Sequence, residues 1–269
     1  MELHGTLGFL GFGNMGGAIL GGLIKTGVLA PENAVVYDID ADKCAAAQGL
    51  GVSVAVSPDD LARRCSMLLL AVKPQSMDDA LAQLKPGFSP ATLVLSIAAG
   101  ISIDYLRKRL GAEIRVARIM PNTPALVGEG AAGIALSENC TDDDGQAAQT
   151  IFEAIGVAVM VPEKAIDAVT ALSGSGPAYF FYTVECLVSA AVAEGLNEDQ
   201  ATKLAAQTLL GAGRLLAESG EPASVLRERV TSKGGTTAAA LAAFRDADLG
   251  GVLAAGVSAA AARSRELGA

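Results

Sequence analysis

The first 162 residues alternate short apolar runs, rich in β-branched side chains, with stretches of helical periodicity. Runs of this length and composition predict strands, and the stretches between them predict connecting helices. The predicted strands are Leu7–Leu10, Ala34–Ile39, Met67–Val72, Thr92–Ile97, Ile114–Met120, Gly133–Leu136 and Val157–Val161. Such alternation is typical of a parallel, doubly wound sheet, so we expect an α/β domain over residues 1–162.

From Glu163 onward the strand pattern disappears, and Ala-rich segments carry helical periodicity instead. The predicted helices are Pro177–Glu194, Glu198–Glu218, Thr236–Phe244 and Leu249–Leu267. We therefore expect a smaller, all-helical C-terminal domain over residues 163–269. Ala-rich amphipathic helices with few aromatic side chains bury their apolar stripes poorly on their own, so this domain is expected to self-associate.

Composition narrows the range of partners. The 269 residues carry a net charge of −9, which argues against nucleic acid or an anionic membrane, because both attract clustered Lys and Arg. The four cysteines lie far apart without a CxxC pair, and the single histidine is His4, so neither a metal site nor a disulfide framework is predicted. We expect buried, reduced thiols, which fit a cytoplasmic location.

One uncharged stretch, Gly5–Ile24, has the length of a signal peptide or a membrane span. Its many glycines, its Asn14 and the lack of Lys or Arg before it argue against both. It contains Gly11-x-Gly13-x-x-Gly16 directly after a predicted strand and at the start of a predicted helix. This is the context of a dinucleotide-binding turn.

Each glycine of this turn has a physical role. Gly11 permits the tight turn, Gly13 lets the backbone approach a pyrophosphate, and Gly16 lets the helix pack on the strand. Amide groups at the helix N-terminus then bind the phosphates. The alternative is a glycine-rich structural turn. The expected cofactor-binding residues here are Leu10, Gly11, Phe12, Gly13, Asn14, Met15 and Gly16.

Five further segments resemble one family, the pyrroline-5-carboxylate reductases. They are Ala71-Val72-Lys73-Pro74, Ser96-Ile97-Ala98-Ala99-Gly100, Met120-Pro121-Asn122-Thr123-Pro124, Ser173-Gly174-Ser175-Gly176-Pro177-Ala178-Tyr179 and Ser232-Lys233-Gly234-Gly235-Thr236-Thr237. The resemblance implies an oxidoreductase that transfers hydride from NADH or NADPH to the imine carbon of 1-pyrroline-5-carboxylate, giving L-proline in the last step of proline biosynthesis. It also implies a Rossmann-like N-terminal domain and a homodimer, or a decamer built of dimers.

The resemblance assigns further residues to the cofactor. Those expected to contact it are Ala71, Val72, Lys73, Pro74, Ala98, Ala99, Asn122 and Glu163. The turns Ser96–Gly100 and Met120–Pro124 are expected to approach the nicotinamide, and the alternative is that each is only a structural loop. For Lys73, at the end of a predicted strand, the alternative is simple solvation. The segment Ser173–Tyr179 predicts the start of a helix, with Ser175 as N-cap and Pro177 in the first turn. It is either a structural hinge or a direct contact to cofactor or substrate.

Asp38 closes the second predicted strand, where this fold places a carboxylate on the adenosine ribose 2′-hydroxyl. The alternative is a strand-end cap. Many relatives have Ser, Thr or Asn near this position and use NADPH, and no Arg lies between Asp38 and Arg63. Because a 2′-phosphate beside this carboxylate meets repulsion, we expect a preference for NADH, with Lys43 best placed to weaken it.

The segment Thr231–Thr237 is the expected substrate-binding loop. Two glycines followed by threonines expose backbone N–H groups and hydroxyls to a substrate carboxylate. Its members are Thr231, Ser232, Lys233, Gly234, Gly235, Thr236 and Thr237. The resemblance implies that Thr237 also bonds the ring nitrogen as the catalytic donor. Lys233 replaces the family's usual proline, which leaves a related cyclic imine open as substrate.

Two rival functions stay open. One is a related two-domain NAD(P)H-dependent imine or β-hydroxyacid oxidoreductase. Such enzymes commonly need a catalytic Lys on the helical domain, where Lys203 and Lys233 lie in no similar motif. The other is a non-catalytic nucleotide-sensing protein, for which the substrate loop is unnecessary.

Overall fold

The computed structural model describes residue 3 and residues 5–268, so His4 lies outside the described residues. The chain divides into two compact units, Met1–Ser175 with Ala260–Ala269, and Gly176–Ala259. This division differs from the predicted boundary after Pro162. Helical periodicity begins at Glu163, but Ile166 and Ala171 are buried and keep residues 163–175 with the first unit.

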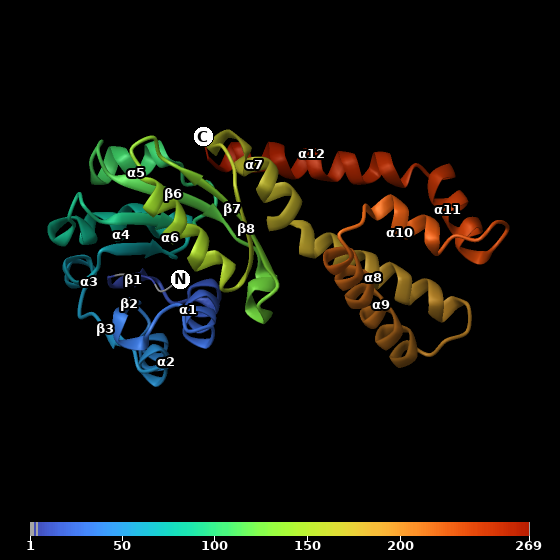
Figure 1. Ribbon diagram of the computed structural model, residues 1–269, viewed down its shortest axis with the longest axis horizontal. Helices are drawn as coiled ribbons and strands as arrows, with labels where there is room; N and C mark the ends of the chain where they lie inside the picture. The colour runs from blue at the N-terminus through green and yellow to red at the C-terminus, as the bar shows by residue number, and fades with distance from the viewer. Residues whose placement is uncertain (1–2, 4, 269) are drawn as a thin grey trace. The chain divides into compact units, whose positions relative to one another are not determined.

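The first unit contains one eight-stranded sheet (Figure 1). Its strands are β1 (Leu7–Leu10), β2 (Ala34–Tyr37), β3 (Ser53–Val54), β4 (Met67–Leu70), β5 (Leu93–Ser96), β6 (Arg115–Met120), β7 (Gly130–Leu136) and β8 (Gly156–Met160). Their order is β3-β2-β1-β4-β5-β6-β7-β8, so the direction of sheet growth reverses between β1 and β4. Ligands bind at such a switch point in doubly wound sheets. The predicted Rossmann-like fold class is confirmed.

The sheet is not parallel throughout, contrary to the prediction. β7 runs antiparallel to β6, with Ala117 opposite Leu136, whereas β8 is again parallel to β7. A single 3₁₀ element, η4 (Thr123–Val127), lies between β6 and β7, and this connection is too short for the crossover that a parallel pair needs. The strand β3 escapes prediction because two residues carry no recognisable pattern.

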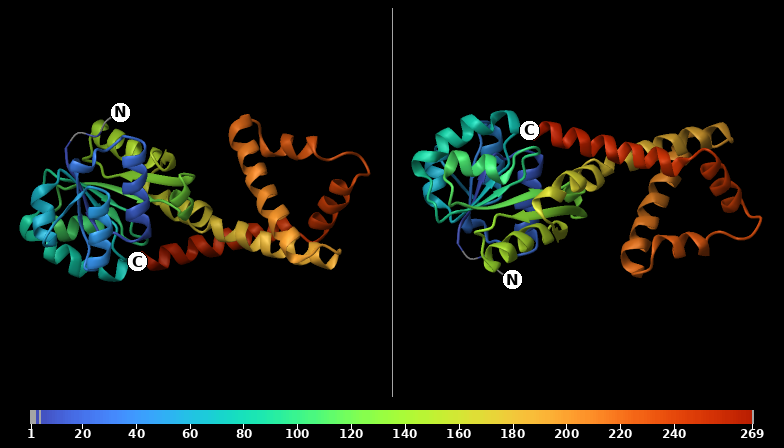
Figure 2. Two further views of the ribbon diagram at one scale, coloured as in Figure 1. Left: turned by 90° about the horizontal axis from the view of Figure 1, so that it is seen from below. Right: turned by 90° about the horizontal axis from the view of Figure 1, so that it is seen from above.

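Helices cover both faces of the sheet, as the two views of Figure 2 show. α1 (Asn14–Lys25), α2 (Ala41–Gly49) and α6 (Asp142–Glu153) enclose one apolar core, which includes Phe9 and Phe152. α3 (Pro58–Arg64), α4 (Met77–Leu84) and α5 (Ile103–Leu110) enclose the other. The short 3₁₀ elements η1 (Pro31–Asn33), η2 (Pro74–Ser76) and η3 (Lys85–Gly87) lie in the connections.

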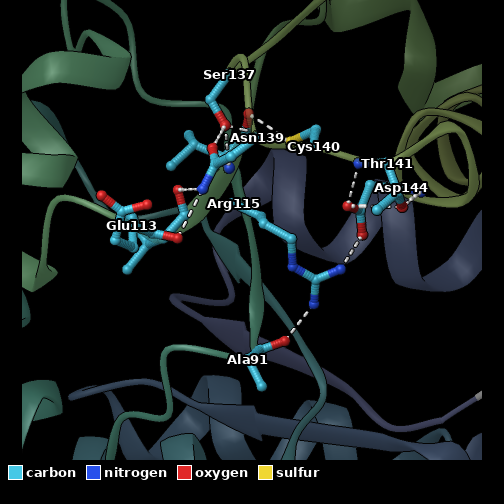
Figure 3. Close-up of polar contacts among 10 residues, drawn as sticks. Ala91, Glu113, Arg115, Ser137, Asn139, Cys140, Thr141 and Asp144 are labelled. Carbon is cyan, nitrogen blue, oxygen red and sulfur yellow. Dashed lines mark hydrogen bonds and ion pairs between the residues drawn. The ribbon is translucent and has the colours of Figure 1, made fainter.

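A polar network holds the antiparallel part of the sheet in place (Figure 3). Arg115, at the start of β6, donates through Nη1 to Asp144 Oδ1 at 2.7 Å, and its guanidinium also donates to the Ala91 carbonyl. Asp144 forms a capping box with Thr141 at the start of α6. Asn139 donates to the carbonyls of the two residues before Arg115. These bonds fix β6 against α6 at the edge opposite the expected ligand site.

The second unit consists of helices. They are α8 (Gly176–Ala193), α9 (Glu198–Ser219), α10 (Ala223–Arg229), α11 (Thr236–Asp246) and α12 (Leu249–Leu267), whose last residues belong to the first unit. The predicted helices are present, and α10 is a short addition to them. Within the first unit, directly before α8, the chain forms η5 (Glu163–Ala165), α7 (Ile166–Val169) and the π-helical η6 (Thr170–Gly174).

The helical stretch Glu163–Ala193 is the one segment of the described residues that is long and apolar enough to cross a membrane. It contains Pro177 and Glu185, and only 6% of its apolar window is buried within the chain. An exposed apolar face of this kind also suits contact with a second protein chain.

The cysteines only partly match the prediction of buried thiols. All four are free, and Cys65 is buried, where desolvation raises the pKa of its thiol to about 12. Cys44 and Cys140 are half-buried, and Cys186 is exposed on α8. The sequence could not reveal this difference, because α8 has apolar residues on all sides.

Candidate active site

The glycine turn after β1 has the geometry of a phosphate-binding site. Gly11 has φ +97°, and a Cβ there would lie 2.9 Å from the Ala71 backbone, so a larger residue cannot fit. A Cβ on Gly16 would lie 2.8 Å from the Gly11 carbonyl oxygen. At Gly13, by contrast, an added Cβ meets no described atom within 4 Å. The space beside Gly13 is open on the side where a pyrophosphate must approach.

The N-terminus of α1 is free to bind an anion. Gly13 is its N-cap, no side chain caps the helix, and no acidic residue lies in its first turn. The first amide groups of a helix are unsatisfied donors at the positive end of the helix dipole. These donors could hold an anion locally on an otherwise acidic chain, and the predicted phosphate contact stays a prediction.

Asp38 is bonded to the glycine turn itself. Its Oδ2 accepts from the Phe12 N–H at 2.6 Å, and its Oδ1 accepts from the Asp40 N–H at 3.0 Å. Lys43 Nζ lies 3.7 Å from Oδ1, and the Asp38 side chain is only 8% exposed. No local sequence pattern indicates the bond to Phe12. The carboxylate is therefore held in one orientation, and its predicted contact with a ribose stays a prediction.

The other predicted residues of the turn differ in what they can offer. The Leu10 side chain is buried in the core on one face of the sheet, and Phe12 and Met15 pack against the core on the other. These residues can reach a cofactor chiefly through their backbone. Gly13 and Asn14, at the start of α1, are more exposed.

Two further segments lie at the same carboxyl edge of the sheet. The Ala71 N–H donates to the Leu10 carbonyl at 2.9 Å, which sets the 71–74 segment beside the glycine turn, with Lys73 and Pro74 exposed. After β5 the chain turns at Ala98–Ile101, where the Ile101 N–H donates to the Ala98 carbonyl. Ala99 is exposed at this turn, whereas Ala98 is 7% exposed.

The Asn122 amide is occupied by contacts within the first unit. Its Nδ2 donates to the Ser173 carbonyl at 3.0 Å, and its Oδ1 accepts from the Ala131 N–H at 2.8 Å. Pro177 lacks the N–H that would bond the Ser173 carbonyl in a regular helix, so this carbonyl is available to Asn122. The side chain thus positions the segment around η6, and its cofactor contact stays a prediction.

Glu163 is also engaged in the protein. Its Oε1 accepts from the Ile103 N–H at 2.8 Å, at the start of α5, and from Arg118 Nη1 at 3.1 Å. The Arg118 side chain is 12% exposed, and sequence analysis gave it no role. Glu163 therefore joins α5, β6 and η5 beside the Ala98–Ile101 turn.

Ser175 is not an N-cap, contrary to the prediction. Its backbone is helical, with φ −83° and ψ −22°, and its N–H donates to the Thr170 carbonyl at 2.8 Å. An N-cap residue instead has extended backbone. The π-helical turn η6 continues into α8, with Pro177 in the first turn of α8 as predicted. Isolated π-helical turns are frequent at functional sites.

The segment predicted to bind the substrate, Thr231–Thr237, lies in the second unit. Gly234 has φ +71°, and Gly235, the N-cap of α11, has extended backbone and no side-chain cap. The first amides of α11, at Thr236 and Thr237, thus lie at a helix N-terminus that no side chain caps. Thr231 differs, since its Oγ1 donates to the Arg227 carbonyl at 2.6 Å and closes α10.

These features define a class of protein, a nicotinamide-dependent oxidoreductase with a doubly wound dinucleotide-binding unit and a helical second unit. The family described as NADP oxidoreductase, coenzyme F420-dependent, matches residues 6–100. The family described as pyrroline-5-carboxylate reductase dimerisation matches residues 163–267.

The chain belongs to the pyrroline-5-carboxylate reductase family. A pyrroline-5-carboxylate reductase of Methanosarcina acetivorans is 41% identical over 263 residues, which cover 97% of each chain. Among solved structures, a pyrroline-5-carboxylate reductase from Coxiella burnetii matches with TM-score 0.94 and 34% identity, covering 99% of this chain and 100% of that one. The NADP-bound pyrroline carboxylate reductase of Plasmodium falciparum matches with TM-score 0.86 and 31% identity over 100% of both chains.

An NAD(P)H cofactor fits the residues present. The open space at Gly13, the uncapped start of α1 and the fixed carboxylate of Asp38 lie where this fold holds the pyrophosphate and the adenosine ribose. Among the described residues no group of three or more His, Cys, Asp or Glu could hold a metal ion.

Proposed function

We propose that this chain reduces 1-pyrroline-5-carboxylate to L-proline. When bound, the nicotinamide supplies the hydride that adds to the imine carbon, and a proton goes to the ring nitrogen. An imine carbon is already electrophilic, so the protein's share is orientation and exclusion of water. The observation that carries the proposal is the pair of uncapped helix N-termini, α1 and α11, each preceded by a glycine turn.

The two units divide the work. The turn Gly11–Gly16 binds the pyrophosphate, and residues 71–74 and 98–99 line the remainder of the cofactor. The loop Thr231–Thr237 binds the substrate carboxylate through the backbone amides at the start of α11. Thr237 is the catalytic residue, and its hydroxyl bonds the ring nitrogen as the imine becomes an amine.

The cofactor is NADH in preference to NADPH. The fixed carboxylate of Asp38 cannot turn away from a 2′-phosphate, because both of its oxygens accept backbone hydrogen bonds. Two charges at about 4 Å repel by roughly 1 kcal/mol in water and about 4 kcal/mol at a protein surface. Lys43, whose side chain is 44% exposed, offsets part of this repulsion.

The working form is a cytoplasmic homodimer joined through residues 163–267, or a decamer built of such dimers. Support comes from the dimerisation family match and from the apolar side chains that helices α8 to α12 leave exposed. The second unit gives no support to the rival imine or β-hydroxyacid oxidoreductase, because none of its lysines lies in a motif that resembles the catalytic lysine motif of those enzymes.

The test mixes purified protein with 1-pyrroline-5-carboxylate and either NADH or NADPH, follows the absorbance of the reduced nicotinamide, and assays proline. We expect proline to form with both cofactors, faster with NADH at equal concentration. Faster turnover with NADPH would still support the proposed reaction, but it would overturn the proposed role of Asp38 in cofactor preference. Oxidation of the cofactor with another cyclic imine but not with this one would favour the rival oxidoreductase, and cofactor binding without turnover would favour the nucleotide sensor.

A further inference from the structure

The end of α12 packs against the turn expected to hold the nicotinamide. α12 begins in the second unit, but residues from Ala260 onward belong to the first, where its last turns lie beside α7 (Figure 1). A Cβ on Gly100 would lie 2.7 Å from the Leu267 carbonyl oxygen and 3.5 Å from the Gly268 nitrogen. The two backbones are thus in direct contact.

Gly100 occupies the critical position of that turn. The Ile101 N–H donates to the Ala98 carbonyl, and Gly100 has φ +76°. This pattern is a type II β-turn, in which the third residue needs positive φ and is therefore usually glycine. Ala99, exposed at the second position, belongs to the turn that the family resemblance places near the nicotinamide, so whatever fixes Gly100 also fixes Ala99.

A buried hydrogen bond holds the same end of α12. Ser264 is 7% exposed and donates through Oγ to Asp167 Oδ1 at 2.6 Å. Asp167 lies on α7, one turn after Glu163, which bonds the start of α5 directly after the Ala98–Ile101 turn. A hydroxyl bonded to a carboxylate is among the stronger hydrogen bonds in proteins. The end of α12 is therefore fixed to α7 and rests on Gly100.

We propose that Ser264 and Asp167 are positioning residues of the cofactor site, acting through the C-terminal contact, which we define as Ser264 on Asp167 and Leu267 on Gly100. This contact holds the Ala98–Ile101 turn in the shape that accepts the nicotinamide ring. It has no part in binding the adenosine half of the cofactor, which lies at Gly13 and Asp38. The inference rests on the proposed placement of the nicotinamide at Ala99.

The test compares two ligands that differ by the nicotinamide ring. ADP-ribose carries the adenosine and pyrophosphate, and NADH adds the ring. We expect Ser264→Ala to weaken NADH binding about ten- to a hundredfold, the range for one lost hydrogen bond to a charged group, with ADP-ribose affinity unchanged. Affinities are measured by calorimetry on the intact protein. The kcat for proline formation is expected to fall in parallel.

Matched variants separate positioning from loss of fold. Ser258→Ala makes the same change at an exposed site of α12 and should leave both affinities unchanged. Asp167→Ala should match Ser264→Ala, the double variant should be no worse than either, and Asp167→Asn, which keeps Oδ1, should restore most of the affinity. Gly100→Ala should have a larger effect than Ser264→Ala, because its Cβ meets the Leu267 carbonyl.

Three results would overturn the inference. One is equal NADH affinity in wild type and Ser264→Ala. The second is loss of NADH and ADP-ribose affinity by the same factor, which indicates a structural role only. The third is an effect of Asp167→Ala without one of Ser264→Ala, which indicates that Asp167 contacts the cofactor directly. Cofactor binding is measured without substrate, so it tests this inference alone. A wild-type protein that binds NADH but makes no proline would instead contradict the proposed function.

Discussion

The two units differ sharply in how much of their apolar surface they bury. The first encloses two cores, with residues such as Phe9, Leu69 and Phe152 almost fully buried. Among the described residues of the second, only Gly176 and Ala201 are buried. Large side chains of α8 such as Phe181 and Tyr182 are 60% and 68% exposed. The predicted cofactor-binding turn is thus held by the core of its own chain, whereas the predicted substrate loop belongs to helices whose exposed apolar side chains suit contact with a second chain.

The largest effect is expected for dimerisation, when an exposed apolar side chain of α8 is replaced by a charged one. A charge at Phe181 would have to be buried against the partner, at a cost of several kcal/mol, so Phe181→Asp should weaken dimerisation by more than about a hundredfold. Sedimentation equilibrium measures the dissociation constant, and activity should fall with the dimer. Leu50→Asp changes an exposed apolar residue of the first unit and should leave the dimer intact. A dimer of Phe181→Asp as tight as wild type would show that α8 is not the interface.

The substrate loop gives the next largest effect. Thr237→Ala removes a hydroxyl expected to bond the ring nitrogen, so kcat/KM should fall about ten- to a thousandfold, the scale of one well-placed donor. The dissociation constant of NADH should stay the same. Thr237→Ser keeps the hydroxyl and should retain most of the activity. If Thr237→Ala has wild-type kinetics, Thr237 lies outside the site.

Local patterns predicted most of the fold and the two glycine turns. The period of apolar residues reports which residues face a core, and Gly11 and Gly16 report where backbones must approach closely. The direction of β7 depends instead on which strand it pairs with, and no local pattern records that pairing. Only the short connection after Asn122 indicates that β7 is antiparallel to β6, because this connection leaves no room for a crossover helix.

The contacts that fix the candidate site escaped prediction for the same reason. The bond from Phe12 to Asp38 joins residues 26 apart in the chain, and that from Ser264 to Asp167 joins residues 97 apart. Each depends on the folded sheet to bring its partners together. For Asn122 and Glu163 the family resemblance marked the positions, but it could not show that their side chains bond to the protein itself.

Gly13→Ala tests whether the pyrophosphate of the cofactor binds at the glycine turn of the first unit. The added Cβ meets no described atom within 4 Å, so the fold should tolerate it, whereas a pyrophosphate against the backbone would be displaced. We expect the KM for NADH to rise about ten- to a hundredfold, roughly 1.4 to 2.7 kcal/mol. The melting temperature should change little, because the poorer N-cap and the lower entropy of the unfolded chain offset each other. Gly21→Ala also adds a Cβ in open space on α1 and should leave KM unchanged. An unaltered KM in Gly13→Ala would place the pyrophosphate elsewhere.

Asp38→Asn gives the smallest expected change, and it separates the effect of the Asp38 charge from the effect of its hydrogen bonds to the glycine turn. Loss of the charge removes repulsion of a 2′-phosphate, so the ratio of kcat/KM for NADPH to that for NADH should rise about tenfold. The amide keeps one oxygen, so one of the two backbone bonds, to Phe12 or to Asp40, is lost, and the KM for NADH should rise a few-fold as the turn loosens. Asp40→Asn removes a nearby charge from a side chain that is 46% exposed and should change the ratio far less. A ratio unchanged in Asp38→Asn, together with a raised KM for NADH, would leave Asp38 as a residue that only positions the glycine turn.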